Sequence, residues 1–284
     1  TDSYGSNEEL LYNLMYLQYD RWSYLTTKEA FEKAFTGQNA GHGFGFGLNS
    51  AGELFISFVY EDSPAGQDGW QRGWQILEIN GQPISVYETD GGYNFDLGES
   101  TPGISNSFTF KLPDGSTTTR SSIKDNYQAN SVLHKEVIDQ GGEKIGYWVY
   151  NSFKATADVS PTKSVEVEET LRYFEEANIN ELIIDLRYNG GGSVDVAEQI
   201  MNALVPAAAD GKLMYTNDFN PDKESLNDTY NFERTNNLTL VKLVVITSRG
   251  SASSSELLIN CLKPYMEVTL VGEQTYGKPV GSFP

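Results

Sequence analysis

Residues 182–192 read LIIDLRYNGGG, and this stretch decides the class of fold. Its first half, residues 182–186, is a nearly continuous apolar run, which is typical of a strand buried on both faces of a sheet. Three glycines follow at the carboxyl end of that strand, just before an expected helix over 195–204. Glycines there let the backbone approach a ligand closely, and ligands bind at such strand ends in α/β sheets. The stretch therefore predicts an α/β domain with a site beside Gly190–Gly192.

The rest of the second half of the chain continues this pattern. Strands are expected at 145–150, 240–247 and 268–272, and helices at 164–177 and 255–266. Strands that alternate with helices indicate a layered, mostly parallel sheet. The predicted fold class is therefore α/β, as part of a multidomain α+β chain.

The first half of the chain has a different character. Residues 7–38 carry apolar and aromatic residues at a mixed helical spacing, with Thr27 as the expected cap of a second helix. Glycines then alternate with Phe44 and Phe46, and an apolar strand pattern follows at 53–60. A dinucleotide fingerprint does not fit, because Phe46 stands where its last glycine is required, and no P-loop lysine follows. These patterns predict a small helical segment followed by a β-rich domain.

Composition excludes several classes of function. The 284 residues include 20 Lys and Arg against 39 Asp and Glu, so the net charge is −19 and a nucleic-acid partner is not expected. Cys261 is the single cysteine, which excludes an internal disulfide and a cysteine-based zinc cluster. The two histidines, His42 and His134, leave little for a metal site or a Ser-His-Asp triad. We therefore expect no metal and no cofactor, and the absence of an 18-residue apolar stretch predicts no transmembrane helix.

The strongest chemical signal lies at residues 246–278. A buried strand leads through the small residues of Ser251–Ser255 into a helix, which places a serine hydroxyl at a helix N-terminus. Free amides and the helix dipole favour a developing negative charge there. We expect one amide of the glycine loop and the amide of Ser254 to form an oxyanion hole together.

These two motifs, in this order, resemble those of the C-terminal processing peptidases, also called tail-specific proteases. The matching segments are 185–192, 251–256 and 275–278, the last with Tyr276 in place of Phe. The family consists of serine endopeptidases that use a Ser-Lys dyad and usually carry a PDZ domain. The resemblance implies that Ser253 is the nucleophile, Lys278 the base and Glu256 a supporting carboxylate. It also implies that the amides of Ser254 and of Gly191 or Gly192 are the oxyanion donors.

Elementary chemistry agrees with a lysine base. A serine hydroxyl is a poor nucleophile without a base, and neither histidine lies in a motif. A lysine must be neutral to accept a proton, and burial can lower its usual pKa of about 10.4 by up to 3–5 units. Two departures from the family pattern are Pro279, where glycine is usual, and Ser282, where a glutamine that orients the lysine is usual.

Residues 43–81 resemble a PDZ domain of the bacterial protease type. The resemblance rests on Gly-Phe-Gly, then Ser-Pro-Ala at 63–65, then a segment ending Ile-Asn-Gly at 79–81, with Trp74 where an aspartate is usual. A PDZ domain binds an extended peptide as an added strand and holds its terminal carboxylate with backbone amides. The resemblance implies that Phe44, Gly45, Phe46 and Gly47 form the carboxylate loop; the alternative is a β-rich domain without a peptide site.

The resulting prediction has three parts: a helical segment at 1–38, a PDZ-like domain at 39–122, and a crotonase-like α/β peptidase core at 123–284, truncated at its C-terminal end. The implied function is cleavage of polypeptides near their C-termini through an acyl-enzyme. The resemblance also implies an extracytoplasmic protein of the periplasm or cell envelope, with a lipid anchor in many relatives. Two alternatives stay open, an inactive peptide-binding protein on the same scaffold and a hydrolase of small esters. The sequence leaves the substrate and the oligomeric state open.

Overall fold

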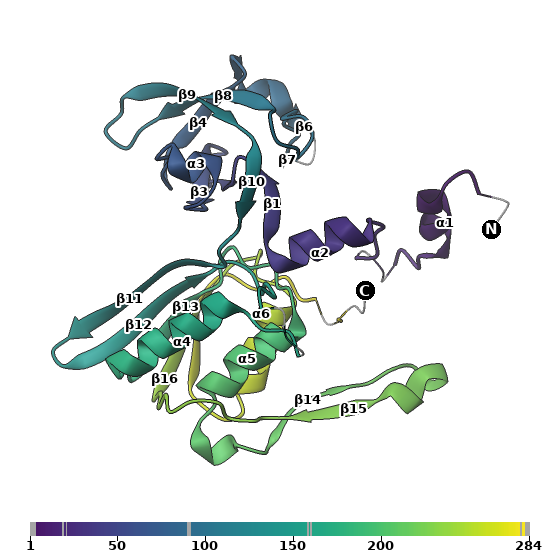
Figure 1. Cartoon of the computed structure of the whole chain (residues 1–284), viewed down its shortest axis with the longest axis vertical. Coiled ribbons are helices and arrows are strands. Elements are labelled where there is room, and N and C mark those ends of the chain that lie inside the picture. The colour runs from purple at the N-terminus through teal and green to yellow at the C-terminus, as the bar shows by residue number, and fades with distance from the viewer. Residues whose placement is uncertain are drawn as a thin grey trace.

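The computed structural model describes residues 4–18, 20, 22–89, 92–157, 159, 161–278 and 280–281. It has the mixed α/β character that the sequence predicts, with two bodies that lie one above the other in Figure 1. The lower body holds the α/β core and the upper body a separate β-sheet. Their buried side chains form two separate clusters, one from residues 148–262 and one from residues 54–110.

A five-stranded sheet forms the centre of the lower body. Its spatial order is β11 (Val132–Gln140), β12 (Glu143–Tyr150), β13 (Glu181–Asp185), β16 (Lys242–Thr247) and β17 (Val268–Gly272). β11 runs antiparallel to β12, and the other neighbours pair in parallel. The predicted parallel arrangement of the apolar strands is therefore confirmed, whereas the sequence did not predict β11.

Three helices pack on this sheet: α4 (Val165–Ala177), α5 (Val194–Leu204) and α6 (Ser254–Leu262). Serine side chains cap the first two, since Ser164 accepts from the amide of Val167 and Ser193 from that of Val196, both at 3.4 Å. Such caps satisfy amides that the helix itself leaves free. Each helix lies within two residues of its predicted start, and α6 ends four residues earlier than expected.

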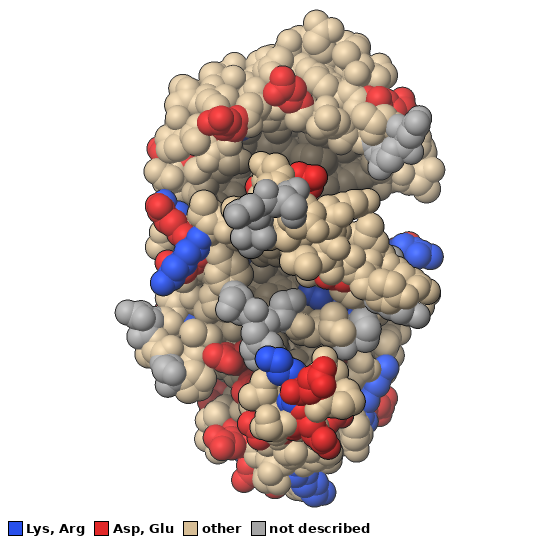
Figure 2. Space-filling view, turned by 90° about the vertical axis from the view of Figure 1, so that its right-hand side faces the viewer, with Lys and Arg blue, Asp and Glu red and all other residues tan. Residues whose placement is uncertain are grey.

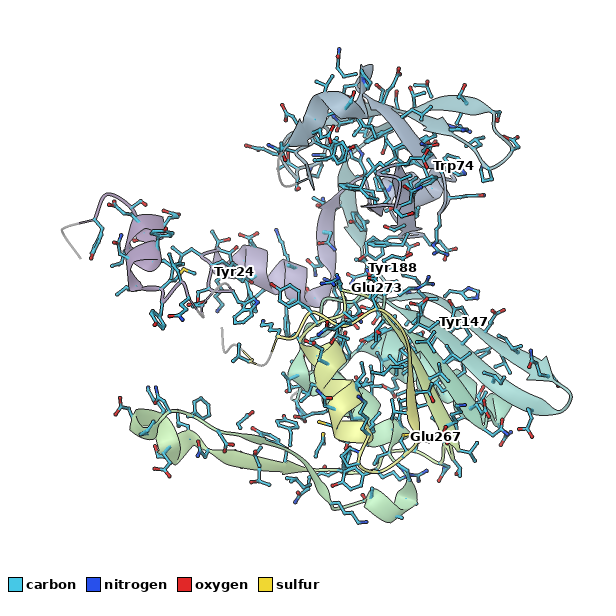
Figure 3. All side chains as sticks on the ribbon, turned by 180° about the vertical axis from the view of Figure 1, so that it is seen from behind. Tyr24, Trp74, Tyr147, Tyr188, Glu267 and Glu273 are labelled. Carbon is cyan, nitrogen blue, oxygen red and sulfur yellow. The ribbon has the colours of Figure 1, made fainter. Side chains whose placement is uncertain are left out.

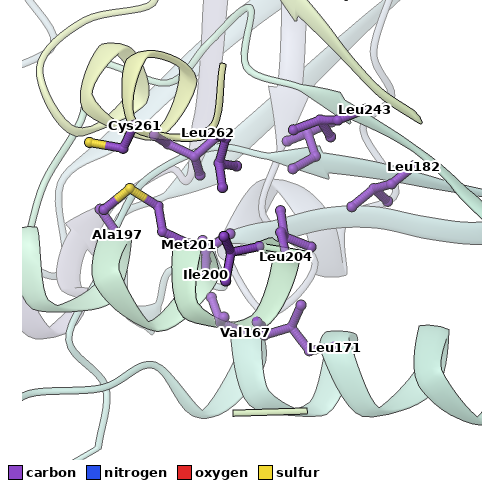
Figure 4. Packing of buried hydrophobic residues seen from close by; sticks show 14 of the residues in the cluster. Val167, Leu171, Leu182, Ala197, Ile200, Met201, Leu204, Leu243, Cys261 and Leu262 are labelled. Carbon is purple, nitrogen blue, oxygen red and sulfur yellow. The ribbon is translucent and has the colours of Figure 1, made fainter. Parts of the chain in front are cut away.

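The core of the lower body lies between these helices and the sheet. Figure 4 shows Met201 of α5 beside Leu262 of α6, with Leu182 and Leu243 of the central strands nearby. Each of these side chains is completely buried. Burial of one such side chain contributes about 1.5–3 kcal/mol to stability. This layer therefore holds β13 and β16 in place beneath the helices.

The upper body is a sheet in the order β2 (Phe44–Leu48), β3 (Leu54–Val59), β4 (Gln75–Ile79), β8 (Ser105–Lys111) and β9 (Thr117–Ile123). It also contains the short elements α3 (Pro64–Gln67), β5 (Gln82–Pro83), η1 (Ile84–Tyr87), β6 (Glu88–Thr89) and β7 (Gly92–Tyr93). Trp70 packs against Phe108 and Phe110, with ring centroids 5.1 and 4.8 Å apart. Residues 44–47, expected as a loop, form the terminal strand β2, because they pair with β3.

Two strands, β1 (Gln38–Gly41) and β10 (Asp125–Gln128), carry the chain into and out of the upper body. They pair antiparallel, with Gln38 opposite Gln128 and Gly41 opposite Asp125. The sequence predicted neither strand. Before β1 lie α1 (Asn7–Leu14) and α2 (Lys28–Thr36), and Thr27 caps α2 as predicted, its hydroxyl accepting from the amide of Ala30 at 3.1 Å.

A hairpin of β14 (Leu213–Asn217) and β15 (Asp228–Asn231) extends away from the lower body in Figure 1. The short helix η2 (Ala207–Ala209) precedes it, and η3 (Pro221–Leu226) forms its tip. The tip lies on the side of the molecule that faces the viewer in Figure 2, and acidic side chains gather on the lower part of that face. The sequence did not predict this hairpin. Within the described ranges, no helix is long and apolar enough to span a membrane.

Candidate active site

The two sequence motifs meet at one edge of the central sheet. Strands β13 and β16 are parallel neighbours, with Asp185 opposite Ile246, so both end at the same edge. The glycine loop leaves β13 there and the serine run leaves β16. The amide of Leu186 still donates to the carbonyl of Ile246 at 2.9 Å, after which the two chains become loops.

Three serine hydroxyls join these loops. Each donates to a backbone carbonyl of the glycine loop or of the strand end before it: Ser251 to Leu186 at 2.7 Å, Ser254 to Gly192 at 2.8 Å, and Ser255 to Asn189 at 3.0 Å. Within the fully described run 251–255, Ser253 is the serine whose hydroxyl donates to none of these carbonyls. The structure therefore assigns anchoring contacts to three serines and leaves the hydroxyl of Ser253 available.

The backbone of Ser253 is strained. Its φ of 59° and ψ of −118° lie in a region that non-glycine residues seldom adopt, and such a residue costs about 1–3 kcal/mol. Ser253 immediately precedes α6, so its half-buried side chain lies at the positive end of the helix dipole. The anchoring hydrogen bonds of its neighbours hold this conformation in place.

The glycine loop approaches Ser253 so closely that only glycine fits. A Cβ on Gly191, where φ is +104°, would lie 2.7 Å from the Cβ of Ser253. The amide of Gly191 donates to Oδ1 of Asn189 at 2.9 Å. The amides of Gly192 and Ser254, by contrast, have no hydrogen-bond partner within the described part of the chain. Of the two glycines predicted as oxyanion donors, Gly192 is thus the one whose amide remains free.

Glu256 joins the serine run to the lysine segment. Its Oε2 accepts from the amide of Ser253 at 2.9 Å and from that of Lys278 at 3.0 Å, and its Oε1 accepts from the amide of Gly277 at 2.6 Å. Burial tends to raise the pKa of Glu256, but hydrogen bonds from the Thr275 side chain and these three amides outweigh it and lower the pKa. The ionised carboxylate of Glu256 therefore links the backbones of Ser253 and Lys278, because both amides donate to the same oxygen.

The side chain of Lys278 is half-buried and points at an aromatic ring. Its Nζ lies 5.8 Å from the centroid of the Trp22 ring, which comes from the segment between α1 and α2. No hydrogen bond between Lys278 Nζ and Ser253 Oγ is present among the described contacts. The structure thus brings the two backbones together while the amine lies against Trp22. Pro279 and Ser282 lie outside the described residues.

An ion pair between a buried carboxylate and a partly exposed arginine fixes the start of the glycine loop. Asp185, almost completely buried, accepts from Nη2 of Arg187 at 2.5 Å and from the hydroxyl of Tyr147 at 3.2 Å. The next residue, Tyr188, lies at the junction of the two bodies in Figure 3. Its hydroxyl accepts from Nη2 of Arg72 at 3.1 Å, and its ring lies 5.8 Å from that of Phe58. The upper body therefore contacts the loop directly.

Sequence reasoning placed Ser253, Ser254, Glu256, Lys278 and the glycines in one region, and the structure brings these backbones together. The residues 44–47 belong to a different sheet and lie outside this cluster. The sequence analysis missed Asn189, Tyr188, Arg72 and Trp22. Asn189 stands inside the quoted motif and offered a signal, whereas Arg72 and Trp22 are distant in sequence and offered none. Within the described residues, no group of three His, Cys, Asp or Glu could hold a metal ion.

Comparison with known proteins identifies the family of the α/β core. Residues 144–284 match the model of peptidase family S41. A carboxyl-terminal-processing protease of Synechocystis is 30% identical over 247 residues, covering 86% of this chain and 54% of the relative. The chloroplastic carboxyl-terminal-processing peptidase 3 of Arabidopsis thaliana is 27% identical over 274 residues, covering 91% and 50%. The chain thus spans about half the length of these relatives.

A solved structure resembles most of the chain. A crystal structure from Bacteroides fragilis, assigned to the S41 proteases, has a TM-score of 0.66 and 27% identity, with 93% of this chain and 75% of that chain covered. The family match includes both loops and the lysine segment described above. Through the α/β core that carries these elements, the chain belongs to peptidase family S41.

Proposed function

We propose that the protein is a serine endopeptidase that cleaves polypeptides near their C-termini through an acyl-enzyme. The observation that carries this proposal is the Glu256 carboxylate, which accepts from the amides of both Ser253 and Lys278. This bridge holds together the two segments whose side chains the reaction requires. Ser253 then attacks a peptide carbonyl, and Lys278 takes the hydroxyl proton and returns it to the leaving amine.

The donors for the oxyanion in this proposal are the amides of Ser254 and Gly192. Their support is that both amides lack partners among the described residues, whereas the amide of Gly191 is bonded to Asn189. Ser254 follows Ser253 and begins α6, and its hydroxyl donates to the carbonyl of Gly192, so a developing negative charge would be stabilised near both amides. The proposal needs no metal and no cofactor.

The upper body is proposed to be a PDZ-like peptide-binding domain. Strand β2 is terminal in its sheet, so a peptide can pair with its outer edge, and Phe46 and Leu48 are about half exposed along it. Residues 44–47 would then supply the strand to which the peptide adds, and the turn at His42–Gly43 before it would hold the carboxylate. The two separate buried clusters support the division between the proposed segments 39–122 and 123–284, and the proposed segment 1–38 contacts the second of them through Phe35.

The family also suggests where the protein acts and on what. We propose an extracytoplasmic location in the periplasm or cell envelope, with a lipid anchor, and polypeptide tails as substrates. A second candidate function is an inactive peptide-binding protein, favoured by the contact of Lys278 Nζ with Trp22 in place of Ser253. The deciding test is hydrolysis of an unstructured protein over a wide pH range, with a small ester measured in parallel. Peptide-bond cleavage supports the endopeptidase, ester hydrolysis alone a small-ester hydrolase, and no hydrolysis the binding protein.

Replacement of Glu256 by glutamine is expected to lower kcat/KM by about 100-fold, because an amide has one acceptor oxygen for three backbone donors and the dyad shifts. Since the folded pKa is lowered, the contribution of Glu256 to stability is present above its unfolded pKa and lost as pH falls through the folded value. The measurement is steady-state kinetics together with thermal unfolding from pH 7 to 3. Equal activity of both proteins would contradict the positioning role.

Replacement of Phe46 by alanine is expected to weaken peptide binding about tenfold, which equals about 1.4 kcal/mol of lost apolar contact. The affinity is measured with the Ser253→Ala protein, so that the peptide is bound without being cleaved. A peptide with an amidated C-terminus is the control and should bind more weakly to both proteins. Unchanged affinity for both peptides would argue against β2 as the binding edge.

A further inference from the structure

The side chain of Asn189 connects the glycine loop to the strand beside it. Its Oδ1 accepts from the amide of Gly191 at 2.9 Å, and its Nδ2 donates to the carbonyl of Tyr150, the last residue of β12, at 3.1 Å. The backbone carbonyl of Asn189 accepts from the amide of Ala252 in the serine run at 3.2 Å. The residue is completely buried. An amide side chain suits this place because it offers one acceptor and a donor at the same end.

The chain that follows β12 sets the direction of the Gly192 amide. The amide of Phe153 donates to the carbonyl of Gly191 at 3.0 Å, and the amide of Ser193 donates to the carbonyl of Phe153 at 2.8 Å. A trans peptide group is planar, so its C=O and N–H point in opposite directions. The amide and the carbonyl of Gly192 therefore both point away from Phe153. On that side the carbonyl accepts from the hydroxyl of Ser254 at 2.8 Å, so the Gly192 amide also faces the serine run.

The glycine loop thus offers two amides, one residue apart, beside the same serine. The loop lies against Ser253, since a Cβ on Gly191 would lie 2.7 Å from the Cβ of that residue. Donors that are fixed before the reaction stabilise a developing charge without the cost of reorganisation. The bond to Oδ1 of Asn189 occupies the amide of Gly191, and of the two amides that of Gly192 stays open.

We infer that Asn189 is a positioning residue that determines which amide of the glycine loop receives the oxyanion. Its side chain holds the Gly191 amide in the interior and leaves the Gly192 amide facing the serine run. Asn189 does not contact the substrate in this role, because it acts through the two glycines. The inference rests on the proposed function, since it assigns a part in the oxyanion hole of that reaction.

The first test compares Asn189→Leu with Asn202→Leu. In both places Oδ1 of the asparagine accepts from a backbone amide at 2.9 Å, from Gly191 in one and from Glu233 in the other, and Asn202 lies in α5 outside the site. Leucine keeps the branching of asparagine and has no polar atom, so each variant loses that hydrogen bond. Steady-state kinetics gives kcat and KM for both variants, and thermal unfolding confirms that they fold.

Asn189→Leu should lower kcat by about 100-fold, because a misplaced donor no longer stabilises the charge that develops after binding. KM should change by less than about 3-fold, since the substrate binds before that charge exists. Asn202→Leu should keep both constants. An equal loss of kcat in the two variants, or a higher KM with an unchanged kcat in Asn189→Leu, would overturn the inference.

A second measurement needs no change at Asn189 and therefore holds even if Asn189→Leu does not fold. An alkyl fluorophosphonate forms a bond between Ser253 Oγ and phosphorus, releases fluoride and passes the hydroxyl proton to the base. The phosphoryl oxygen of this adduct takes the place of the oxyanion. Hydrogen bonding moves an amide proton resonance downfield, so the NMR signals of Gly192 and Ser254 should move and that of Gly191 should not. A moved Gly191 signal with an unmoved Gly192 signal would refute the inference.

Amide exchange in the Ser253→Ala protein separates the inference from the proposed function. The Gly191 amide should exchange with solvent at least about 10-fold more slowly than the Gly192 amide, and Asn189→Leu should remove the difference. This pattern, together with no hydrolysis and no labelling of the wild type, would reject the peptidase and still support the selection of the Gly192 amide by Asn189. Rapid exchange at Gly191 in a protein that hydrolyses peptides would keep the peptidase and reject the inference.

Discussion

Replacement of Ser253 by alanine should lower hydrolysis of an unstructured protein by about 10⁴-fold or more, to the level left by binding and the oxyanion donors alone. The reason is that the serines at 251–255 make different contacts. Ser251, Ser254 and Ser255 each donate to the glycine loop, and the hydroxyl of Ser253 does not. The fold should tolerate the change, because the hydroxyl of Ser253 makes none of the three hydrogen bonds that join the serine run to the glycine loop.

Ser255→Ala is the matched control for this experiment. It removes one hydroxyl from the same run, but that hydroxyl is completely buried and donates to Asn189. We expect it to lose about 1 kcal/mol of stability and to keep most of its activity. A fluorophosphonate probe should label the wild type and not Ser253→Ala, with the site read by mass spectrometry. Hydrolysis that survives in Ser253→Ala and falls in Ser255→Ala would assign the nucleophile to another residue.

Replacement of Lys278 by alanine should reduce hydrolysis as far as the loss of Ser253, because a serine hydroxyl without a base is a poor nucleophile. Residues that act as one unit are strongly non-additive, so the double variant should be no slower than either single variant. The measurement is kcat/KM for the three proteins, with thermal unfolding to confirm folding.

Lys278→Arg separates charge from proton transfer. An arginine keeps the positive charge and a similar length but does not lose its proton in proteins. If Lys278 is the base, this variant should be as inactive as Lys278→Ala at every pH. If the side chain serves only as a positive charge, much of the activity should return. Activity of Lys278→Arg near the wild-type level would therefore refute the base and leave Ser253 without its partner.

The α/β core was predictable because its signals are local. The apolar runs at 182–186 and 240–247 have the length and composition of buried strands, and glycines and serines mark where they end. Ends of neighbouring parallel strands meet at one edge, so the meeting of the two loops followed from the pattern. The cap at Thr27 was predictable for the same reason, since one side chain satisfies an amide a few residues away.

The features that were missed depend on distant or polar pairing. Strand β11 has a mixed pattern of exposed and half-buried residues that does not indicate a strand. It forms a strand because it pairs antiparallel with β12. Residues 44–47 were expected as a carboxylate loop from the resemblance to a PDZ domain, yet their pairing with β3 makes them a strand. A Cβ on Gly45 would lie 2.2 Å from the ring of Phe58. The contact of Trp22 with Lys278 joins the two ends of the sequence, so no local pattern predicts it.

Because β1 pairs with β10, the upper body is an insertion between two neighbouring strands. Gln38 and Gln128 face each other across the ladder, and the amide of Ala129 donates to the carbonyl of Gly37 at 2.8 Å, so the chain returns to the place from which it left. A tight turn of two residues closes such a pair in natural hairpins. Because Gly41 and Asp125 lie opposite each other, we expect a short turn between them to close the chain without the β2–β9 sheet. The same junction is where we expect another binding domain to be insertable, although the contacts of Tyr188 with Arg72 and Phe58 would then be lost.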